Sequence, residues 1–308
     1  MSLRVSVIIV NYNVKEFLLS CIKSIYNNMK RDEVEIIVVD NASTDNSEQA
    51  VKNQFPDVVW ISNNYNAGFS EANNQGMNIA KSPVLFLLNP DTELTDGALE
   101  GLIEKQKEFP NSILVPQLLN SDGSLQVSCW RFPKIRDIIF ESLGLHLIFD
   151  LKNYNVEKFS NEFNPDCASG AALLFGKNVF ISTGGLDKNL FWSEDIDFCY
   201  RASLRGIQTK YFPLYKIYHH SGKSSSQNLN IPISNQLLSK AKYFAKNSGR
   251  ITWIISLCFI LLHIVTRIIA FSILSVFKPE TFTRKRKAYI YTLHYYFDYL
   301  IRKSKAIT

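Results

Sequence analysis

Amide and carboxylate side chains gather directly after three apolar segments in the first hundred residues. The three clusters are Asn11-Tyr12-Asn13, Asp40-Asn41-Ala42-Ser43-Thr44-Asp45 and Asn89-Pro90-Asp91-Thr92-Glu93. Ligands of open α/β sheets bind at the carboxyl ends of the strands. If the apolar segments are neighbouring strands, the clusters converge on one cleft for a polar ligand. The alternative is that Asn, Asp and Ser only form turns and cap helices.

Asp91 and Glu93 place two carboxylates two residues apart, directly after the apolar segment Val84–Leu88. In a turn or an extended segment, two such carboxylates can share a hard divalent cation, Mg²⁺ or Mn²⁺. A cation held there would neutralise a diphosphate. Two carboxylates at this spacing are common on protein surfaces. The position of this pair directly after a predicted buried strand is what favours a metal site.

A second group of acids, Glu194, Asp195 and Asp197, follows Phe191 and Trp192. A carboxylate beside aromatic rings is partly desolvated and can act as general base toward a sugar hydroxyl. The alternative is a solvated helix start, where acids interact favourably with the helix dipole. Both interpretations can hold if one acid bonds the helix while another faces the cleft.

Two histidines, His219 and His220, follow the apolar segment Tyr211–Tyr218 and precede the sequence SGKSS, which contains Lys223. A histidine at a strand end can bind a metal, and a Gly/Ser/Lys loop can contact phosphate. A histidine in such a position can equally be structural.

Strand-like and helix-like patterns alternate in the elements that must position these residues. Strands are expected at Val5–Val10, Glu35–Val39, Val58–Ile61 and Val84–Leu88. Helices are expected from Glu16, from Asp45, and over Glu71–Ala80, Ala98–Phe109, Ile135–Phe149 and Phe198–Leu204. Apolar strands separated by helices indicate an α/β fold with a mostly parallel, doubly wound sheet.

The composition excludes several classes of protein. With 308 residues, 46% hydrophobic and 20% charged, the chain is globular. The net charge of +6 comes from residues 278–308, which hold eight basic and two acidic residues. The rest of the chain is neutral, which argues against a nucleic acid partner.

The cysteines and the absence of several short motifs from the sequence argue against further classes of protein. Five scattered cysteines without a C-x-x-C pair argue against a disulfide framework or a zinc site. The run Val5–Val10 is too short for a secretory leader, so we expect the chain to fold in the cytosol. The usual signatures of NAD binding, P-loop chemistry and serine hydrolysis do not occur in the sequence.

The segment Ile251–Phe277 is apolar, with Arg267 as its only full charge. As a helix it would be ~40 Å long, enough to cross a ~30 Å hydrocarbon core. A single crossing from the cytosol would place the basic run Arg284–Lys287 outside, against the positive-inside tendency. A helix packed inside the protein is the alternative to any membrane contact.

We therefore expect residues 226–308 to form a helical, membrane-associating region that inserts from one side. The basic run and the tyrosines near it would meet anionic headgroups. The chain would then sit on the cytoplasmic face of the membrane, beside a membrane-embedded acceptor.

Seven motifs, in order, carry a resemblance to a known family. They are VSVIIVNYN, VVDNASTD, NNYNAGFSEANNQG, LLNPDTEL, ASGAALLF, GGLDKNLFWSEDIDFCYRASLRG and HHSGKSS. With these motifs the chain strongly resembles the family 2 inverting glycosyltransferases of the GT-A fold, especially their rhamnosyltransferase-like branch. The match runs from Val5 to Ser225. It implies a Rossmann-like GT-A domain over residues 1–225.

The resemblance also implies roles for individual residues. Contacts to a nucleoside-diphosphate sugar are implied for Asn11, Tyr12, Asn13, Asp40, Asn41, Asn66, Gly68, Asn73, Asn74, Asn89 and Lys223. Asp40 would accept the imide N–H of uracil or thymine. Metal binding is implied for Asp91, Glu93 and His220, and catalysis for Asp195, as general base, together with Glu194. Trp192 and Gly170 are placed on the acceptor side.

The implied reaction is a single displacement that inverts the anomeric carbon. The donor would be a dTDP- or UDP-sugar, with rhamnose as a candidate sugar, and the acceptor a lipid-linked saccharide used in cell-surface polysaccharide synthesis. This chain departs from the family at the metal motif, which reads Asp-Thr-Glu, and at Glu71–Asn74, where many relatives have an arginine. Neutralisation of the diphosphate would then depend more on the metal and on later residues such as Lys223.

Two other classes stay open at this point. A nucleotidyltransferase also uses a metal-binding acid pair, but it usually has a Gly-rich, basic loop near the N-terminus, and Asn11–Phe17 has no glycine. A sugar-nucleotide binding protein without turnover would tend to lose Asp91 and Asp195, and both are present.

Overall fold

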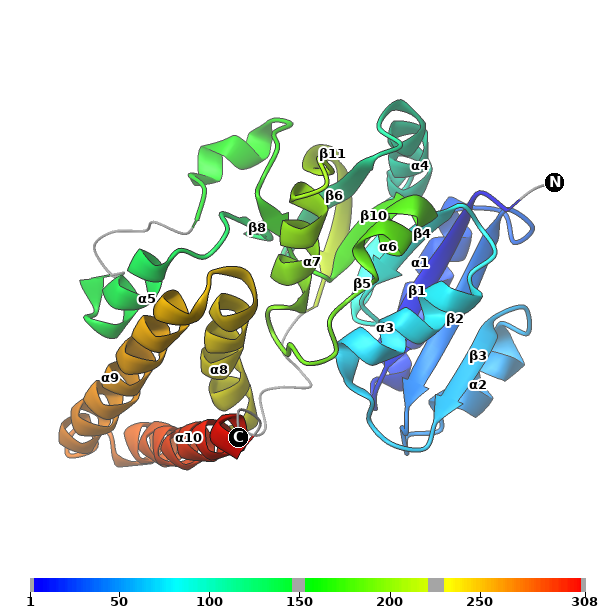
Figure 1. The fold of residues 1–308 in the computed structure, drawn as a ribbon. Helices are drawn as coiled ribbons and strands as arrows, with labels where there is room; N and C mark the ends of the chain where they lie inside the picture. The colour runs from blue at the N-terminus through cyan, green and yellow to red at the C-terminus, as the bar shows by residue number, and fades with distance from the viewer. Residues whose placement is uncertain (1–2, 146–152, 221–229, 306–308) are drawn as a thin grey trace. The chain divides into compact units, whose positions relative to one another are not determined.

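The chain forms two compact units. The computed structural model describes residues 3–145, 153–220 and 230–305. The sheet unit comprises Met1–Phe132, Asn153–Asn189 and Glu194–Ser224, and the helical unit comprises Pro133–Lys152, Leu190–Ser193 and Ser225–Thr308. The division into residues 1–225 and 226–308 stays a prediction, and Figure 1 shows the chain of both units coloured from the N-terminus to the C-terminus.

One large sheet organises the sheet unit. Its strands are β1 (Val5–Asn11), β2 (Val34–Asn41), β3 (Val59–Asn63), β4 (Val84–Leu88), β5 (Thr92–Leu94), β6 (Ser112–Leu119), β7 (Leu125–Gln126), β10 (Ala172–Gly176) and β11 (Gln208–His219). The order is β3-β2-β1-β4-β10-β6-β11-β5, and β7 pairs with β6. A separate pair joins β8 (Cys129–Trp130) and β9 (Cys167–Ala168).

The sheet is mostly parallel, as the alternating pattern predicts. Strands β1, β2, β3, β4, β6 and β11 run in one direction, and β5, β7 and β10 run in the other. The sheet with its flanking helices confirms the expected α/β class. The antiparallel strand β10 between β4 and β6 is a feature that the local pattern did not predict.

Helices cover both faces of this sheet. They are α1 (Lys15–Asn28), α2 (Ser47–Gln54), α3 (Gly68–Ile79), α4 (Ala98–Glu108), α6 (Lys177–Thr183) and α7 (Glu194–Ser203), with a 3-10 helix, η2 (Val156–Ser160). On one face, Val7 and Ile9 of β1 pack in the core with Leu18 and Ile22 of α1. On the other face α3 packs closely, since a Cβ at Gly76 would lie 2.5 Å from a methyl carbon of Ile8.

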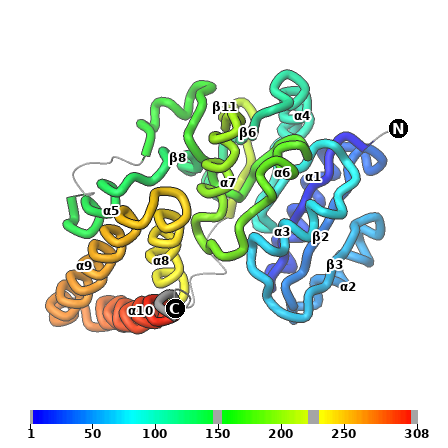
Figure 2. Tube along the Cα trace, in the orientation of Figure 1, coloured from blue at the N-terminus to red at the C-terminus, as the bar shows by residue number. Residues whose placement is uncertain are grey.

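The helical unit consists of α5 (Ile135–Ser142), α8 (Asn230–Asn247), α9 (Arg250–Leu274) and α10 (Pro279–Lys305). The short helix α5 occupies the first part of the predicted helix 135–149, whose last residues lie outside the described chain. Helix α10 folds back along α9, since the Phe271 and Phe282 rings stack 5.8 Å apart and the Tyr296 hydroxyl donates to the Leu257 carbonyl (Figure 2). Among the described residues, α9 is the one helix that is long and apolar enough to cross a membrane.

Candidate active site

The ends of β1 and β2 bring Asn11 and Asp40 side by side, because the two residues pair in register. The Asn11 amide donates to Asp40 Oδ1 at 2.7 Å, and the Ser43 backbone N–H donates to Oδ2 at 2.9 Å. Asp40 is 6% exposed. The other amide atom, Asn11 Oδ1, is buried without a hydrogen-bond partner in the described part of the chain. Buried polar atoms are normally paired, so this oxygen is an unsatisfied acceptor at the end of β1.

The loop after β1 is fixed to the loop after β2. The Asn13 backbone N–H donates to Ser43 Oγ at 2.9 Å, and Asn13 Oδ1 accepts from the Thr44 backbone N–H at 2.7 Å. Asn13 adopts a φ of 54°, in the left-handed region that asparagine tolerates. The neighbouring Tyr12 ring is 46% exposed, so it is open to stacking by a ligand.

Asp45 joins the starts of two helices below these loops. Its carboxylate accepts from the Lys15 backbone N–H at 2.8 Å and from the Ser47 backbone N–H at 3.1 Å, and it also bonds the Ser47 hydroxyl. Burial alone would raise the pKa of Asp45, but these hydrogen bonds outweigh it and lower the pKa below its ordinary value. Asp45 therefore supports the site and is not itself placed in it.

Asn41 links β2 to the start of α3. Its Oδ1 accepts from the Asn63 amide at 3.1 Å and from the Ala67 backbone N–H at 3.3 Å, while its own amide donates to the Gly68 carbonyl at 3.3 Å. Asn66 Oδ1 in turn accepts from the Gly68 backbone N–H at 3.0 Å. The predicted residues Asn41, Asn66 and Gly68 are thus brought together at one edge of the sheet.

Asn73 and Asn74 make contacts of a structural kind. The Asn73 amide donates to the Phe69 carbonyl within α3 at 2.9 Å. Asn74 bonds the backbone of Leu186 in both directions, donating to its carbonyl at 2.8 Å and accepting from its N–H at 2.9 Å. Asn74 therefore fixes the loop after α6, a role that the sequence did not suggest.

The Asp-Thr-Glu segment lies against the carboxyl end of β11, because β5 and β11 pair antiparallel with His219 opposite Thr92. His219 Nε2 lies 3.4 Å from Asp91 Oδ1, and His220 Nε2 lies 3.2 Å from Glu93 Oε1. The His220 backbone N–H donates to the Asp91 carbonyl at 2.8 Å. Each carboxylate of the predicted metal motif thus faces one imidazole.

The donor set fits a hard or borderline divalent cation, which binds carboxylate oxygen and imidazole nitrogen. Within the described ranges, no three His, Cys, Asp or Glu side chains are already arranged to hold a metal ion together. His219, unlike His220, is not predicted from the sequence to be a metal-site residue. The antiparallel register of β5 and β11 is the signal that identifies it, and this register joins residues far apart in the chain.

Asn89 and Cys21 support the same segment. The Asn89 amide lies 3.3 Å from His219 Nε2, and the Asn89 carbonyl accepts from the Thr92 hydroxyl at 2.7 Å. Cys21 Sγ lies 3.6 Å from both Asn89 O and Thr92 Oγ1. Burial raises the pKa of the Cys21 thiol to about 12, so the thiol stays neutral and its role is structural.

Asp195 at the start of α7 is oriented by two backbone groups. Its Oδ2 accepts from the Gly170 N–H at 3.0 Å and its Oδ1 from the Ile196 N–H at 2.8 Å. A side chain at Gly170 would crowd the Phe69 ring, since a Cβ there would lie 3.1 Å from it. The next residue, Ala171, accepts from the Asn89 backbone N–H at 2.9 Å. Asp195 and Gly170 are therefore tied to the strand end that carries the Asp-Thr-Glu segment.

The three acids of α7 have different surroundings. Asp197 is fully buried, and its carboxylate accepts from Arg201 Nε at 2.7 Å. Arg201 also donates to the carbonyls of Thr183 and Gly185. Asp197 is thus a structural acid that fixes the helix, whereas Asp195 and Glu194 lie half-buried at its start.

Two predicted residues do not contribute to the geometry of the sheet unit. Trp192 belongs to the short segment Leu190–Ser193 of the helical unit, where it is 45% exposed with a φ of 77°. Lys223 lies outside the described residues.

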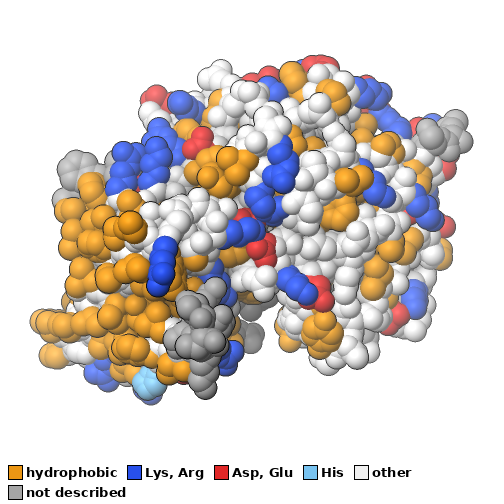
Figure 3. Space-filling model, in the orientation of Figure 1, with side chains coloured by type: hydrophobic (Ala, Val, Ile, Leu, Met, Phe, Trp, Pro, Cys, Tyr) orange, Lys and Arg blue, Asp and Glu red, His pale blue; other side chains and the backbone are white. Residues whose placement is uncertain are grey.

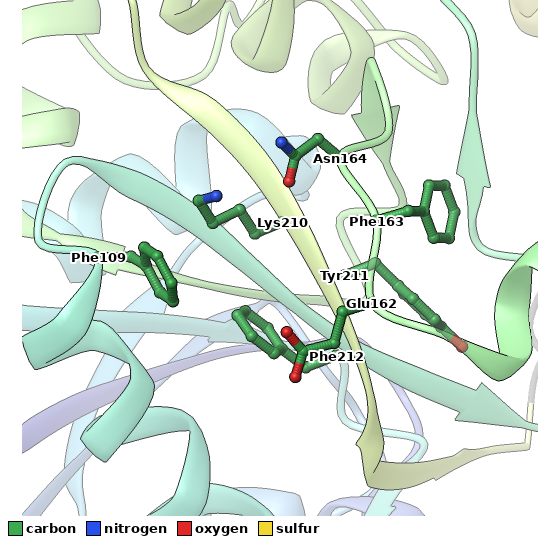
Figure 4. A pocket seen from close by; sticks show the side chains of 7 residues that line it. All are labelled: Phe109, Glu162, Phe163, Asn164, Lys210, Tyr211 and Phe212. Atoms are coloured by element: carbon green, nitrogen blue, oxygen red, sulfur yellow. The ribbon is translucent and has the colours of Figure 1, made fainter.

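A cavity of about 230 Å³ in the sheet unit is lined by none of these cluster residues, and Figure 4 shows the side chains that line it. It is lined by aromatic side chains, among them Phe109 and Phe163, and by Lys210 and Glu162. Lys210 stands near the beginning of β11, whereas His219 ends the same strand. The cavity therefore lies at the amino ends of the strands, on the side opposite to where α/β sheets bind their ligands.

The chain is similar in sequence to known glycosyltransferases. The sequence model described as "Glycosyl transferase family 2" matches residues 6–160. The chain is 27% identical over 258 residues to a low-salt glycan biosynthesis hexosyltransferase, Agl10, of Haloferax volcanii, covering 80% of this chain and 79% of that protein. It is 26% identical over 217 residues to an N-acetylglucosaminyl-diphospho-decaprenol L-rhamnosyltransferase of Mycobacterium tuberculosis, covering 63% and 69%.

Solved structures share the fold at low sequence identity. The crystal structure of GalNAc-T7 with UDP, GalNAc and Mn²⁺ superposes with a TM-score of 0.57 at 15% identity, covering 79% of this chain and 50% of that one. The structure of S. aureus TarS 1-349 in complex with UDP gives a TM-score of 0.53 at 14% identity, covering 83% and 69%. The family match spans half of the chain and includes the clusters after β1, β2 and β4, so the chain belongs to glycosyl transferase family 2.

Proposed function

We propose that this glycosyltransferase inverts the anomeric carbon as it transfers a hexose, with rhamnose as the first candidate, from a UDP- or dTDP-sugar to a lipid-linked saccharide. The observation that carries the proposal is the Asp195 carboxylate, oriented by the Gly170 N–H beside the strand ends where the other polar clusters lie. A correctly oriented carboxylate next to a donor site is what a single displacement requires.

The named relatives support the lipid-linked acceptor. One acts on a diphospho-decaprenol-linked sugar, and a Campylobacter jejuni relative, 30% identical over 166 residues, is named as a glucosyltransferase acting on an undecaprenol-linked glycan. Such acceptors are anchored in a membrane by their lipid. We accordingly place the enzyme at the cytoplasmic face, where nucleotide sugars are available.

The cluster of Asn11 and Asp40 is proposed as the pocket for a pyrimidine base. The Asp40 carboxylate is proposed to accept the imide N–H of uracil or thymine. The Asn11 amide and the Ser43 backbone N–H donate to this carboxylate and keep it in place. The exposed Tyr12 ring is available to stack on the base.

A divalent cation, Mg²⁺ or Mn²⁺, is proposed to bind at Asp91 and Glu93, with the imidazoles of His219 and His220 next to them. When bound, the cation would neutralise charge on the diphosphate. The two histidines orient the carboxylates, and Asn89 and Cys21 fix the turn that presents them.

In the proposed reaction, the acceptor hydroxyl transfers its proton to Asp195 while its oxygen forms a bond to the anomeric carbon. The bond from that carbon to the diphosphate oxygen breaks, and its electron pair leaves with the nucleoside diphosphate. Attack comes from the face opposite the leaving group, so the configuration inverts. The Gly170 and Ile196 N–H groups keep the carboxylate in place while it takes the proton.

The experiment is to incubate the purified full chain with UDP- and dTDP-sugars, Mg²⁺ or Mn²⁺, and a polyprenyl-diphosphate saccharide in detergent. We expect one donor to be consumed and NMR of the product to show the inverted anomeric configuration. A product that retains the configuration would contradict the mechanism. Tight binding of a donor without any transfer would indicate a binding protein instead.

A further inference from the structure

Helix α9 exposes one continuous apolar face. Exposed apolar residues recur every three or four positions along it, and we call them the apolar stripe: Ile251, Ile255, Cys258, Leu262, Val265, Ile269 and Ile273. Their spacing places them on one side of a helix. The large aliphatic members are between 37% and 76% exposed, which is unusual for a face of this length.

The opposite face of α9 is covered by the helical unit itself. Leu257, Ile260 and Ile264 are buried there, and α5, α8 and α10 pack against α9. Helix α10 runs antiparallel beside it, as the contacts between Phe271 and Phe282 and between Leu257 and Tyr296 require. Helix α9 is thus already packed on one side and open on the other.

This packing argues against a transmembrane span. Lys285 Nζ lies 5.9 Å from the centre of the Phe271 ring, so its charge stands beside the apolar segment and not beyond its end. If α9 crossed the hydrocarbon core, α10 would carry Lys285, His294 and Asp298 into the core with it, at high cost. Both helices avoid this cost if they lie along the surface.

Basic side chains stand at both ends of the apolar stripe. Lys246 and Arg250 are exposed before its first turn, and Lys278 is exposed after its last. Lys285 and Lys287 are exposed on α10, which runs back beside the last turns of α9. Hydrophobic side chains gather over α9 and α10 in the space-filling view, with Lys and Arg side chains at the margin of this area (Figure 3). An apolar face bordered by cations complements an anionic bilayer, where chains accept the apolar residues and headgroups pair with the charges.

We infer that the apolar stripe of α9 lies in the plane of an anionic lipid bilayer, at the level between headgroups and acyl chains. Basic residues at both ends of the helix then contact anionic headgroups. This inference concerns how the chain binds a membrane, and its tests measure vesicle binding rather than turnover. A failure of the proposed reaction and a failure of this inference can therefore be told apart.

Cys258 is a natural reporter, because it is exposed within the stripe while Cys21, Cys129, Cys167 and Cys199 are buried. The full chain is labelled there with an environment-sensitive fluorophore and mixed with phosphatidylcholine vesicles with and without phosphatidylglycerol. We expect a blue-shifted emission with anionic vesicles, and a much smaller shift with neutral vesicles or at high salt. Equal shifts with both vesicles would contradict the part assigned to the basic residues.

Substitutions within and outside the stripe test its position. Ile269→Asp with Ile273→Asp should weaken vesicle binding more than tenfold, because two carboxylates then enter the apolar face. Ile181→Asp and Leu214→Asp are the matched controls, since both residues are apolar and well exposed in the sheet unit. Equal loss in the controls would overturn the assignment.

Charge is tested by Lys278→Gln with Lys287→Gln, which should lower affinity for anionic vesicles roughly fivefold for each charge removed. Lys23→Gln with Lys188→Gln is the matched control, because these exposed lysines lie in the sheet unit.

Depth separates an in-plane helix from a span. Nitroxide labels at Ile251→Cys, Leu262→Cys and Ile273→Cys, each in a Cys258→Ser chain, should report equal depths by collision with oxygen and a water-soluble nickel complex. A label at 262 that is much deeper than the other two would show a span. A labelled Cys258 that ignores vesicles in a chain that is dimeric in solution would show that a second copy covers the stripe.

Discussion

The sheet unit and the helical unit differ in how they bury apolar residues. In the sheet unit Val7, Ile8 and Ile9 of β1 are fully buried, and the polar side chains are collected at the strand ends. In the helical unit the most apolar helix keeps one face exposed, with Ile251 at 76% and Ile273 at 61%. We expect catalysis to depend on the sheet unit and membrane binding on the helical unit, so that a substitution can change one without the other.

The largest effect is expected from Asp195→Asn, which keeps the shape of the residue and removes the proton acceptor. Turnover should fall ~10²–10⁴-fold while donor binding stays unchanged. The measurement is kcat with a saturating donor, beside calorimetric donor affinity. Binding to anionic vesicles should stay at the wild-type level, which sharpens the contrast between the units.

Asp57→Asn is the matched control for this substitution, because Asp57 pairs with Arg31 on the surface. Near-normal turnover of Asp195→Asn would exclude this carboxylate as the base.

The next effect concerns stability within the sheet unit. Asp197→Ala removes the partner of Arg201 from a fully buried position and should lower the free energy of unfolding by about 3–5 kcal/mol. The ion pair of Glu141 and Lys240 in the helical unit is more exposed, at 34% and 20%. Glu141→Gln should therefore cost no more than about 1 kcal/mol. Urea unfolding of both variants tests the difference, and equal costs would contradict it.

A smaller effect is expected at the proposed metal site. Asp91→Ala should weaken metal-dependent binding of UDP on the order of 10²-fold, and His219→Gln about tenfold, because His219 orients the carboxylate. Calorimetry with Mn²⁺, and again with EDTA, gives both affinities. If wild type and Asp91→Ala bind UDP equally in Mn²⁺, the metal is not held by this segment.

The smallest effect is expected from Asp45→Asn, which weakens the bonds that tie α1 to α2 and should cost about 1 kcal/mol at pH 7. The folded pKa of Asp45 lies below the ordinary value of 3.8, so its carboxylate stabilises the fold above that pH. This contribution is lost as pH falls through the lowered pKa, and the two proteins should become equally stable there. A difference that stays constant down to pH 2 would rule out the carboxylate as its source.

Much of the sheet could be predicted from the sequence, because each strand is a short β-branched run followed by a helical period. The segment Val84–Leu88 was predicted with the bounds that β4 has, and Ala98–Phe109 differs from α4 by one residue. The polar clusters after β1, β2 and β4 could also be found, since the ends of parallel strands share one edge.

Pairings between distant residues could not be predicted from local periodicity. The contact of His219 with Asp91 depends on the register of β11 against β5, and the bond from Gly170 to Asp195 depends on β10 entering the sheet. Asp197 is buried and Asp195 half-buried because one side of α7 packs against the rest of the sheet unit. A run of acidic residues in the sequence does not indicate which side that is. The pairing of Asn11 with Asp40 could be predicted from the sequence, because the two residues end neighbouring strands.

The place of β10 between β4 and β6 has a consequence for how the protein is made. Domains fold from the N-terminus during synthesis, and contacts between distant residues form late. Strands β1 to β4 leave the ribosome first and can pair at once, but β4 keeps an open edge until residues 172–176 arrive, and β6 gains its neighbour β11 later still. A partly synthesised chain therefore carries the clusters of Asn11 and Asp40 but not Asp195 or His219, and the site is completed only when β11 has emerged.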